Sequence, residues 1–544
     1  MIKVILNGVE TEIKVNTPIM NLVKNPKSYC IATVNNRIRE LKYSINKPCT
    51  INLLDLTNKE ATRTYEASLR YLFAMAFENL YPNAEVEFNY SISRSILCLF
   101  SKTNEKIDSQ FALKMEKEMK RLVDLDLNIS RKRIPTADAI KLYEEKGYEE
   151  KVRILKYREE SFVNVYECNG YINYMFGYMV PSTGYLSNFK LTPYYPGVIL
   201  QYPRSDSSGE IPSFEDAPVY SKTLSQASKW AEICCGDYIS DMNKHVENHT
   251  EIDFINMCET KHNNMLAELG EKIVNDSNDI RLIAIAGPSS SGKTTFAMRL
   301  KIELMTKGLN PVMISIDDYY KSVKEAPKDE DGKPDLEHIE ALDIDLFNKD
   351  MLSLIQGEKV TLPKFDFKTG ERKEGKTIQV NDREPIIIEG IHALNERLTS
   401  LIPRSQKFKI YIAPQIQMHI DNHNPINMTD IRLLRRLVRD KNYRGTEAVK
   451  TLEMWESVRR GEFRWIYPTQ EDANFVYNSE LSYEICVMKK YALPMLEAIK
   501  RDDEYFIQAN RLVKFLKYFK DIDDKWIPCN SLIREFIGGS CFHV

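Results

Sequence analysis

Apolar and polar residues alternate at the start of the chain, over residues 2–6 and again over 11–15, with Gly8 between the two runs. This period of two, interrupted by a turn residue, predicts a β-hairpin. Pro18 favours the first turn of a short helix, and the runs IATVNN and INLLDL predict further strands. Hairpin, helix and strands in this order are typical of a small β-grasp module.

The period changes from about Glu60, where apolar residues recur at helical spacing until Pro82. Strand-like runs follow over 84–90 and 95–100, and charged residues with helical spacing extend from 108 to about 158. Residues 160–202 are rich in Tyr, Gly and Pro, which predicts strands and loops. A turn-rich loop at 204–218 then precedes a mostly helical segment.

A third pattern begins at Arg281, where four short apolar runs alternate with helical spans. The runs are RLIAIAG, VMISID, PIIIEG and FKIYIA. Continuously apolar strands separated by helices predict a buried parallel sheet, and therefore an α/β domain.

A phosphate-binding loop of the form GxxxxGK[ST] stands between the first of these strands and a predicted helix. Backbone N–H groups of such a loop surround phosphates, the lysine reaches the β- and γ-phosphates, and the hydroxyl after it binds Mg²⁺. The alternative is an ordinary Gly/Ser turn, but both flanking elements fit the loop. The predicted nucleotide-binding residues are Gly287, Pro288, Ser289, Ser290, Ser291, Gly292, Lys293, Thr294 and Thr295.

Carboxylates follow two of the other predicted strands, Asp317 after VMISI and Glu389 at the end of PIIIE. Ligands bind at the carboxyl ends of strands in open α/β sheets. Asp317 could accept a proton from an attacking hydroxyl, and both carboxylates could help to hold Mg²⁺. The alternative is that Asp317 and Asp318 cap a turn.

Arginines are concentrated between 432 and 444, and Arg432, Arg436 and Arg439 share one helical face. A solvated basic helix is one interpretation. The other is a lid whose guanidinium groups stabilise a transferring phosphoryl group.

The composition narrows the type of protein and agrees with the predicted elements. The 544 residues carry a net charge of −3 and are 43% hydrophobic, which is typical of a globular protein and excludes a polycation. No apolar run approaches the roughly 18–20 residues of a membrane span, and the first residues predict a strand and not a signal peptide. Together with the net charge, this predicts no membrane partner. Ten scattered cysteines without a CxxC pair predict a reduced, cytoplasmic protein.

Six motifs in the C-terminal half resemble the uridine kinases and their phosphoribulokinase relatives. They are GPSSSGKTT, SIDDYYK, DLEHIEALDID, LPKFDF, IIIEGIHAL and RRLVRDKNYRG, within residues 280–480. The resemblance implies an ATP- and Mg²⁺-dependent kinase with Asp317 as general base. It implies Thr294, Asp317 and Glu389 at the metal, and Glu337 at the ribose hydroxyls.

The remaining site residues follow from the same resemblance. The implied lid consists of Arg436, Arg439 and Arg444. The predicted catalytic set is Asp317, Lys293, Arg436 and Arg439. The predicted substrate-binding set is Asp317, Tyr320, Glu337, Phe365, Arg372, Arg436 and Arg444. His338 and His392 lie near these motifs and are assigned no catalytic role.

Three positions depart from the uridine kinase pattern. Phe365 replaces the tyrosine of YDF, Gly370 stands where the family has a base-recognising histidine, and Met454 stands where it has a pyrimidine-reading glutamine. Because these polar groups are missing, the sequence does not determine which nucleoside base is recognised, although the phosphoryl-transfer residues are retained.

The N-terminal half resembles the beginning of threonyl-tRNA synthetase. Residues 1–60 resemble its TGS domain, and ENLYPNAEVEF with VPSTGYLSNFKL resemble its second additional, editing domain. The metal-type cluster of that family is replaced by Ala67, Tyr71, Met175 and Met179, which cannot activate a water as His and Cys ligands would.

The predicted fold class is multidomain: an α/β P-loop kinase with a parallel sheet, preceded by a β-grasp module and an α+β editing-like domain. The predicted boundaries are 1–58, 59–215, a helical connector at 216–279, the kinase at 280–485 and a helical extension at 486–544. The leading hypothesis is ATP-dependent phosphorylation of the 5′-hydroxyl of uridine or a related nucleoside. The alternatives are a kinase of another hydroxylated metabolite and a nucleotide-switched RNA-binding regulator; a homo-oligomer stays open.

Overall fold

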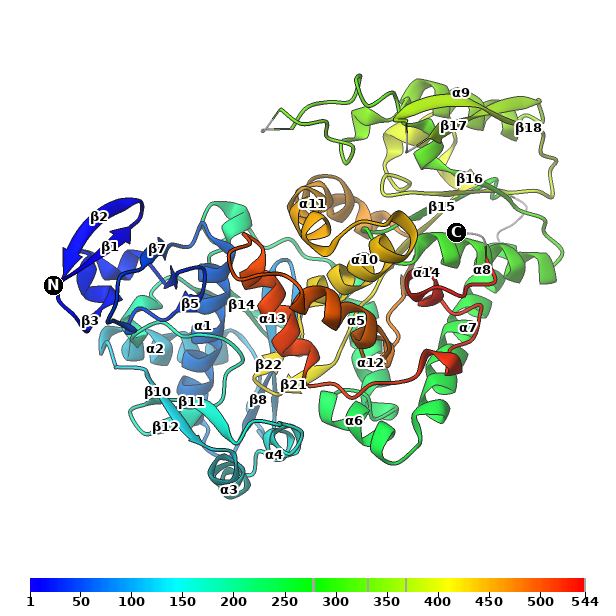
Figure 1. Cartoon of the computed structure of the whole chain (residues 1–544). Coiled ribbons are helices and arrows are strands. Elements are labelled where there is room, and N and C mark those ends of the chain that lie inside the picture. The colour runs from blue at the N-terminus through cyan, green and yellow to red at the C-terminus, as the bar shows by residue number, and fades with distance from the viewer. Residues whose placement is uncertain (276–278, 330–331, 367–368, 543–544) are drawn as a thin grey trace.

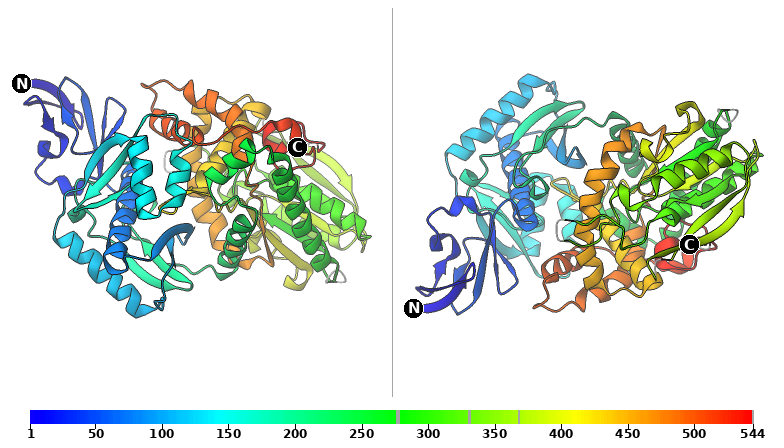
Figure 2. Two further views of the ribbon diagram at one scale, coloured as in Figure 1. Left: turned by 90° about the horizontal axis from the view of Figure 1, so that it is seen from below. Right: turned by 90° about the horizontal axis from the view of Figure 1, so that it is seen from above.

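The computed structural model describes residues 1–275, 279–329, 332–366 and 369–542. Figure 1 shows the N-terminal half, from blue to cyan, beside a C-terminal half that runs from green to red. The two further views in Figure 2 show the same separation along the chain, with the N-terminal sheet at one extremity.

The N-terminal sheet confirms the predicted hairpin, since β1 (Ile2–Leu6) pairs antiparallel with β2 (Val9–Ile13). The strand order is β2-β1-β7-β4-β5, with β7 at Thr50–Leu54, β4 at Ile31–Val34 and β5 at Ile38–Arg39. The helix expected after Pro18 is only a 3₁₀ turn, Ile19–Leu22. A short pair, β3 (Thr17–Pro18) with β6 (Ser44–Ile45), completes this part.

The predicted long helix is α1 (Lys59–Leu80), whose N-cap Asn58 accepts a hydrogen bond from the N–H of Glu60. Its buried face packs in a core shared with a four-stranded sheet of order β13-β14-β9-β8. The strands are β8 (Glu85–Ile92), β9 (Ser95–Ser101), β13 (Lys190–Tyr194) and β14 (Gly197–Gln201).

The interpretation of 108–158 as wholly helical is wrong in one place. Between α2 (Ser109–Asp124) and α3 (Thr136–Lys146), residues Ser130–Pro135 form β10, an edge strand paired with β11 (Phe162–Cys168). The sequence Arg131-Lys132-Arg133 is exposed on that edge, where charged side chains discourage pairing with other chains. The remaining elements here are α4 (Glu149–Leu155) and β12 (Tyr171–Asn173).

Three helices connect the halves, as the sequence indicates: α5 (Pro218–Ile233), α6 (Ile239–Glu247) and α7 (Glu251–Asn275). The sheet that follows is entirely parallel, with order β16-β19-β15-β20-β23. Four of its strands were predicted: β15 (Leu282–Ala286), β16 (Val312–Ser315), β19 (Ile386–Glu389) and β20 (Lys407–Ala413). The fifth, β23 (Phe475–Asn478), was not predicted from the sequence.

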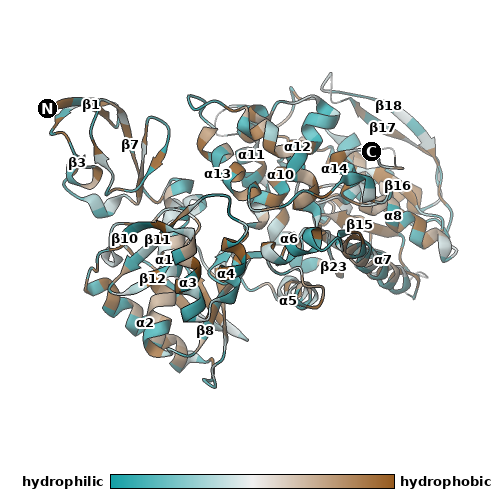
Figure 3. Ribbon diagram, turned by 60° about the horizontal axis from the view of Figure 1, so that its bottom comes forward, coloured by the Kyte–Doolittle hydropathy of each residue, from teal (hydrophilic) through white to brown (hydrophobic). Residues whose placement is uncertain are grey.

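The parallel sheet is buried because helices cover it. In Figure 3 the hydrophobic colour gathers in the strands around β15, and all five residues of β15 are buried. The covering and flanking elements are α8 (Lys293–Thr306), α9 (Ile344–Ile355), α10 (Met428–Arg444), α11 (Ala448–Gly461) and α12 (Glu484–Glu497). No helix in the described ranges is long and apolar enough to cross a membrane.

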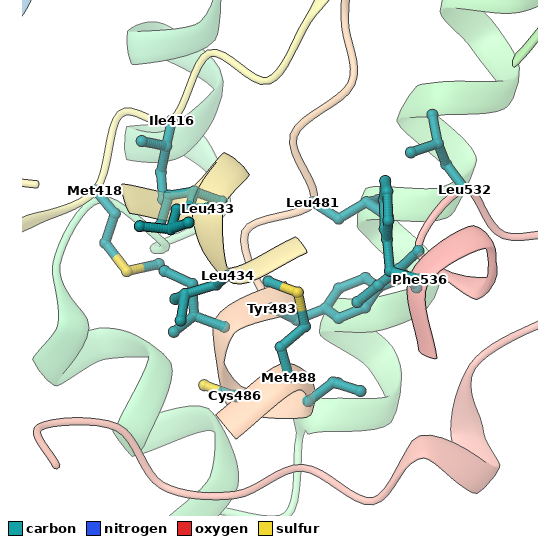
Figure 4. Close-up of a cluster of buried hydrophobic side chains, with 14 of the residues drawn as sticks. Ile416, Met418, Leu433, Leu434, Leu481, Tyr483, Cys486, Met488, Leu532 and Phe536 are labelled. Carbon is teal, nitrogen blue, oxygen red and sulfur yellow. The ribbon is translucent and has the colours of Figure 1, made fainter. Parts of the chain in front are cut away.

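The C-terminal segment packs back onto this domain. After α13 (Phe506–Leu516), the chain reaches α14 (Arg534–Ile537), which lies against α10. Figure 4 shows Leu532 and Phe536 in one buried cluster with Leu481 and Tyr483. Leu532, Ile533, Phe536 and Ile537 therefore belong to the core of the C-terminal half.

Two hairpins project from the C-terminal half. One is β17 (Val360–Asp366) with β18 (Glu371–Ile378), and the other is β21 (His419–Asp421) with β22 (Asn424–Pro425). The second hairpin is buried against the N-terminal half, where Lys151 Nζ lies 2.6 Å from Asp421 Oδ1.

Candidate active site

The phosphate loop joins β15 to α8, as the sequence predicts. A Cβ on Gly287 would lie 2.0 Å from the carbonyl oxygen of Ile412, so only glycine fits there. Gly292 and Ser290 both have positive φ angles, 87° and 60°, which turn the loop before the first residue of the helix. The loop therefore leaves the N-terminus of α8 facing the space at the carboxyl ends of the strands.

Lys293 curls over this loop. Its Nζ donates hydrogen bonds to the carbonyl oxygens of Gly287 (3.0 Å) and Pro288 (3.2 Å). Burial lowers the pKa of Lys293, and the nearby carboxylates of Glu389 and Asp317 oppose that shift. The ammonium group thus lies between the loop and the two predicted carboxylates.

Asp317 and Glu389 come from neighbouring strands, because Ser315 of β16 is in register with Glu389 of β19. The Ser315 hydroxyl donates to Glu389 Oε1 at 3.3 Å. Burial raises the pKa of Glu389 to about 7, and the charge of Asp317 adds to the rise. Burial also raises the pKa of Asp317, against the attraction of Lys293.

The adjacent Asp318 has a different role. Its carboxylate accepts the backbone N–H of Phe365 at 3.3 Å and pairs with Lys364 at 3.1 Å. It therefore fixes β17 to the turn after β16, whereas Asp317 interacts electrostatically with Lys293 and the arginines of α10.

The half-buried carboxylates of Asp317 and Glu389 and the hydroxyl of Thr294, in the first turn of α8, are oxygen donors of the kind that Mg²⁺ prefers. In the described residues no group of three or more His, Cys, Asp or Glu side chains is gathered for a metal. Two carboxylates are enough for the Mg²⁺ of a kinase, because that ion takes one or two carboxylates and completes its coordination with phosphates and water. The donor set therefore fits a nucleotide-bound Mg²⁺.

The arginines of α10 divide into two groups. Arg432 and Arg435 are buried and form ion pairs with Glu462 and Glu484, respectively. Their charges are neutralised within the protein, although Arg432 Nε also donates to the carbonyl oxygen of Ser289 at 3.1 Å. These two residues hold α10 in place.

The predicted lid residues form the other group. Arg436 Nη1 donates to Ser289 Oγ in the phosphate loop at 2.9 Å. Arg439 and Arg444 both lie near Asp440, at 3.0 and 3.6 Å, and both interact electrostatically with Asp317. The structure thus brings all three to the side of the loop that faces Asp317.

Glu337 belongs to the same charged region. Burial raises its pKa to about 7, opposed first by Arg436 and then by Lys293. The ring nitrogen Nε2 of His392 lies 3.0 Å from the carbonyl oxygen of Glu337. Burial lowers the pKa of His392 to about 4, so at neutral pH it is uncharged and Nε2–H can donate to that carbonyl.

The other predicted substrate residues lie on the β17–β18 side. Phe365 is buried with its ring centroid 5.6 Å from that of Tyr320. Gly370 has a φ of +71°, and a Cβ there would lie 2.8 Å from Val323 Cγ2, so no side chain is accommodated without movement. Arg372 donates to Asp343 Oδ2 at 2.8 Å, at the start of α9.

One site residue escaped the sequence analysis. Glu535 of α14 is 8% exposed, and its Oε2 accepts the N–H of Thr295 in the first turn of α8 at 3.1 Å. Leu532 also packs against the phosphate loop, since a Cβ on Gly292 would be 2.2 Å from Leu532 Cδ2. No motif surrounds Glu535, and only the folded chain brings it to the phosphate loop.

A parallel sheet with this loop at the carboxyl end of β15 places the protein among the P-loop nucleotide-binding proteins. Residues 282–481 match the profile of the Phosphoribulokinase / Uridine kinase family. The uridine kinase of Borrelia duttonii (strain Ly) is 32% identical over 199 residues, 36% of this chain and 85% of the relative. The chain belongs to this family, which implies ATP as phosphoryl donor and a small-molecule acceptor.

Other proteins are also similar to part of this chain. The uridine kinase of Schizosaccharomyces pombe (strain 972 / ATCC 24843) is 34% identical over 210 residues, which are 38% of this chain and 39% of that protein. Among solved structures, a possible uridine kinase from Bacillus stearothermophilus is similar over 40% of this chain and 98% of its own, with 20% identity and a TM-score of 0.26.

Proposed function

We propose that this protein transfers the γ-phosphoryl group of ATP to the 5′-hydroxyl of a nucleoside, uridine or a related one. The observation that supports this most directly is the meeting of Lys293, Asp317 and Glu389 beside the phosphate loop. A base, a cation and an oxygen donor for Mg²⁺ then surround the point where the hydroxyl would meet the triphosphate.

Each residue has a distinct part in the proposed transfer. Asp317 accepts the proton of the 5′-hydroxyl while the new O–P bond forms and the bond to ADP breaks. Lys293 and the N–H groups of the loop neutralise the β- and γ-phosphates, and Arg436 and Arg439 stabilise charge on the transferring group. Mg²⁺ held by Thr294, Asp317 and Glu389 would supply further charge neutralisation.

Glu337, Tyr320, Phe365, Arg372 and Arg444 complete the proposed substrate site. Glu337 would accept hydrogen bonds from the ribose hydroxyls, and Arg444 would close the site together with Arg436. The apolar Phe365 and the tight turn at Gly370 offer no hydrogen bonds to a base from their side chains. We therefore leave the base unassigned within nucleosides.

We further propose that the N-terminal half is a TGS-like module and an editing-like domain without chemistry, with the boundaries given above. Ser68 of α1 lies 3.7 Å from Met179 through its Oγ and Sδ atoms. The Tyr71 hydroxyl donates to the carbonyl oxygen of Tyr171 at 2.8 Å. These contacts support a region that is packed and hydrogen-bonded within itself, where Met and Ala side chains replace metal ligands.

A turnover screen tests the proposal. Purified protein is incubated with ATP, Mg²⁺ and a panel of nucleosides and other hydroxylated metabolites, and phosphorylated product and ADP are quantified by chromatography. We expect stoichiometric products with at least one nucleoside, and none when EDTA removes the metal. Product only from hydroxylated metabolites that are not nucleosides would support the other kinase hypothesis, and the nucleoside assignment would then be wrong.

A further inference from the structure

A large cavity, lined by none of the phosphate-loop residues, lies between the two halves of the chain. Its volume is about 660 Å³, and it is lined by residues of β5, α1, β10 and β11 from the N-terminal half and by α13 and the first turn of α10. Figure 1 shows α13 between the N-terminal half and α10. None of the residues assigned to the kinase site lines this cavity.

The cavity has an excess of positive charge. Nine basic and five acidic residues line it. Four of the acidic side chains are already held by arginines of the cavity itself: Glu60 by Arg63, Glu66 by Arg70, Glu160 by Arg158 and Asp430 by Arg511.

The cations that remain come from both halves. Among the described residues, Arg37, Arg39, Arg131 and Lys514 form no ion pair with a carboxylate. Glu159, which is exposed, is the only lining carboxylate that lacks an ion pair within the described ranges. Four cations against one carboxylate favour a ligand with several negative charges.

An aromatic ring lies between two of these cations. The ring centroid of Tyr178 is 5.5 Å from the Arg131 guanidinium carbon and 5.8 Å from Lys514 Nζ. Phe176, Phe506 and Tyr157 also line the cavity. Flat apolar faces beside cations suit a ligand that carries both an aromatic ring and phosphates.

We propose that this cavity is a second ligand site that binds a nucleoside di- or triphosphate. Arg131, Lys514, Arg37 and Arg39 neutralise the phosphates, and the base packs against the aromatic side chains near Tyr178. The volume lies within the range of small-molecule sites, about 300–1,000 Å³. Because the basic residues come from β5, β10 and α13, a bound ligand bridges the two halves.

Nucleotide binding by the full chain tests this site once the kinase site is disabled. Titration calorimetry is performed with ATP, UTP and GTP on Lys293→Ala, which lacks the lysine of the phosphate loop. We expect one remaining binding event, weakened at least tenfold by Arg131→Glu with Lys514→Glu and weakened by added salt. The matched control is Lys500→Glu, an exposed lysine outside the cavity, which should leave the affinity unchanged.

Two further ligands show whether the cavity recognises a free nucleotide, phosphate groups alone or RNA. Inorganic triphosphate should bind at least tenfold more weakly than the best nucleotide, and Tyr178→Ala should reduce that difference. Equal binding of triphosphate and nucleotide, no residual binding in Lys293→Ala, or no effect of the double charge reversal overturns the proposal. A single-stranded oligoribonucleotide that binds where no free nucleotide does overturns it in favour of RNA. Circular dichroism and melting curves verify that each variant is folded.

Discussion

Asp317 and Asp318 are neighbours in sequence, yet their surroundings give them different roles. Asp318 accepts the Phe365 N–H and pairs with Lys364. Asp317 instead lies in the electrostatic field of Lys293 and Arg439. The motif alone could place a carboxylate at the end of β16 but could not separate these two residues. The distinction depends on β17, which lies more than forty residues further along the chain.

Glu480 permits a test of burial at the scale of one side chain. Burial and the charge of Glu484 raise its pKa to about 7. The native state therefore keeps a proton that the unfolded state loses near pH 4.5, so stability falls as pH rises through the window from about 4.5 to 7. Glu480→Gln cannot ionise and should escape this loss.

The measurement is the free energy of unfolding in urea at pH 5 and pH 8. We subtract the free energy of unfolding of the wild type from that of Glu480→Gln at each pH. We expect this difference to be about 1–3 kcal/mol more favourable to Glu480→Gln at pH 8 than at pH 5. Glu358→Gln, at an exposed position, should show no such change. An identical pH dependence in wild type and Glu480→Gln would contradict the expected protonation.

At the scale of elements, α10 shows how far spacing predicts function. The i, i+4, i+7 pattern placed Arg432, Arg436 and Arg439 on one face, and all three do lie toward the phosphate loop or Asp317. Spacing could not reveal that Glu462 neutralises Arg432, because that partner belongs to another helical segment. Only the folded chain shows that Arg432 pairs with a buried glutamate, whereas Arg436 and Arg439 share Asp440.

The contact of α14 with α8 leads to a prediction about nucleotide affinity. The Glu535 carboxylate accepts the Thr295 N–H at the N-terminus of α8, where phosphate would bind. It also adds negative charge next to Lys293. Glu535→Gln retains the hydrogen-bond acceptor without the charge. We expect it to lower the dissociation constant for ATP, on the order of tenfold, in calorimetric titration.

Glu504→Gln provides the control, since Glu504 is exposed and lies on the same C-terminal segment. It should leave ATP affinity unchanged. If Glu535→Gln binds ATP as the wild type does, or more weakly, then Glu535 does not compete with the nucleotide.

Sequence predicted the elements whose signals are local. The phosphate loop, four parallel strands and the first hairpin follow from periodicity and motif, and all are present. The edge strand β10 was missed because its charged residues resemble a helix surface, and Glu535 because its partner is 240 residues away. Contacts set by tertiary packing leave no local pattern to detect.

At the scale of the whole molecule, the β21–β22 hairpin joins the halves through a buried ion pair. The side chains of Lys151 and Asp421 are 1% and 0% exposed. Asp421 also accepts hydrogen bonds from His423 N–H and Asn424 Nδ2, both at 2.8 Å. The kinase half therefore depends on the N-terminal half for burial of this hairpin.

Lys151→Met should destabilise the protein by about 3–5 kcal/mol, because it leaves Asp421 buried and unpaired. Lys151→Met with Asp421→Asn removes both charges and should recover part of that loss, as measured by urea unfolding. The control, Lys3→Met, breaks an exposed pair with Glu10 and should cost less than about 1 kcal/mol. Equal effects of Lys151→Met and Lys3→Met would mean that the buried pair does not join the halves.

The role of Asp317 as general base is tested most directly by comparing Asp317→Asn with Asp318→Asn in nucleoside turnover and in ATP binding. If Asp317 is the base, Asp317→Asn lowers kcat about 10²–10⁴-fold with ATP affinity within about threefold of the wild type. Asp318→Asn, which loosens only the anchor of β17, should stay within about tenfold of the wild-type kcat. Turnover by Asp317→Asn at more than a tenth of the wild-type rate would mean that Asp317 is not the general base.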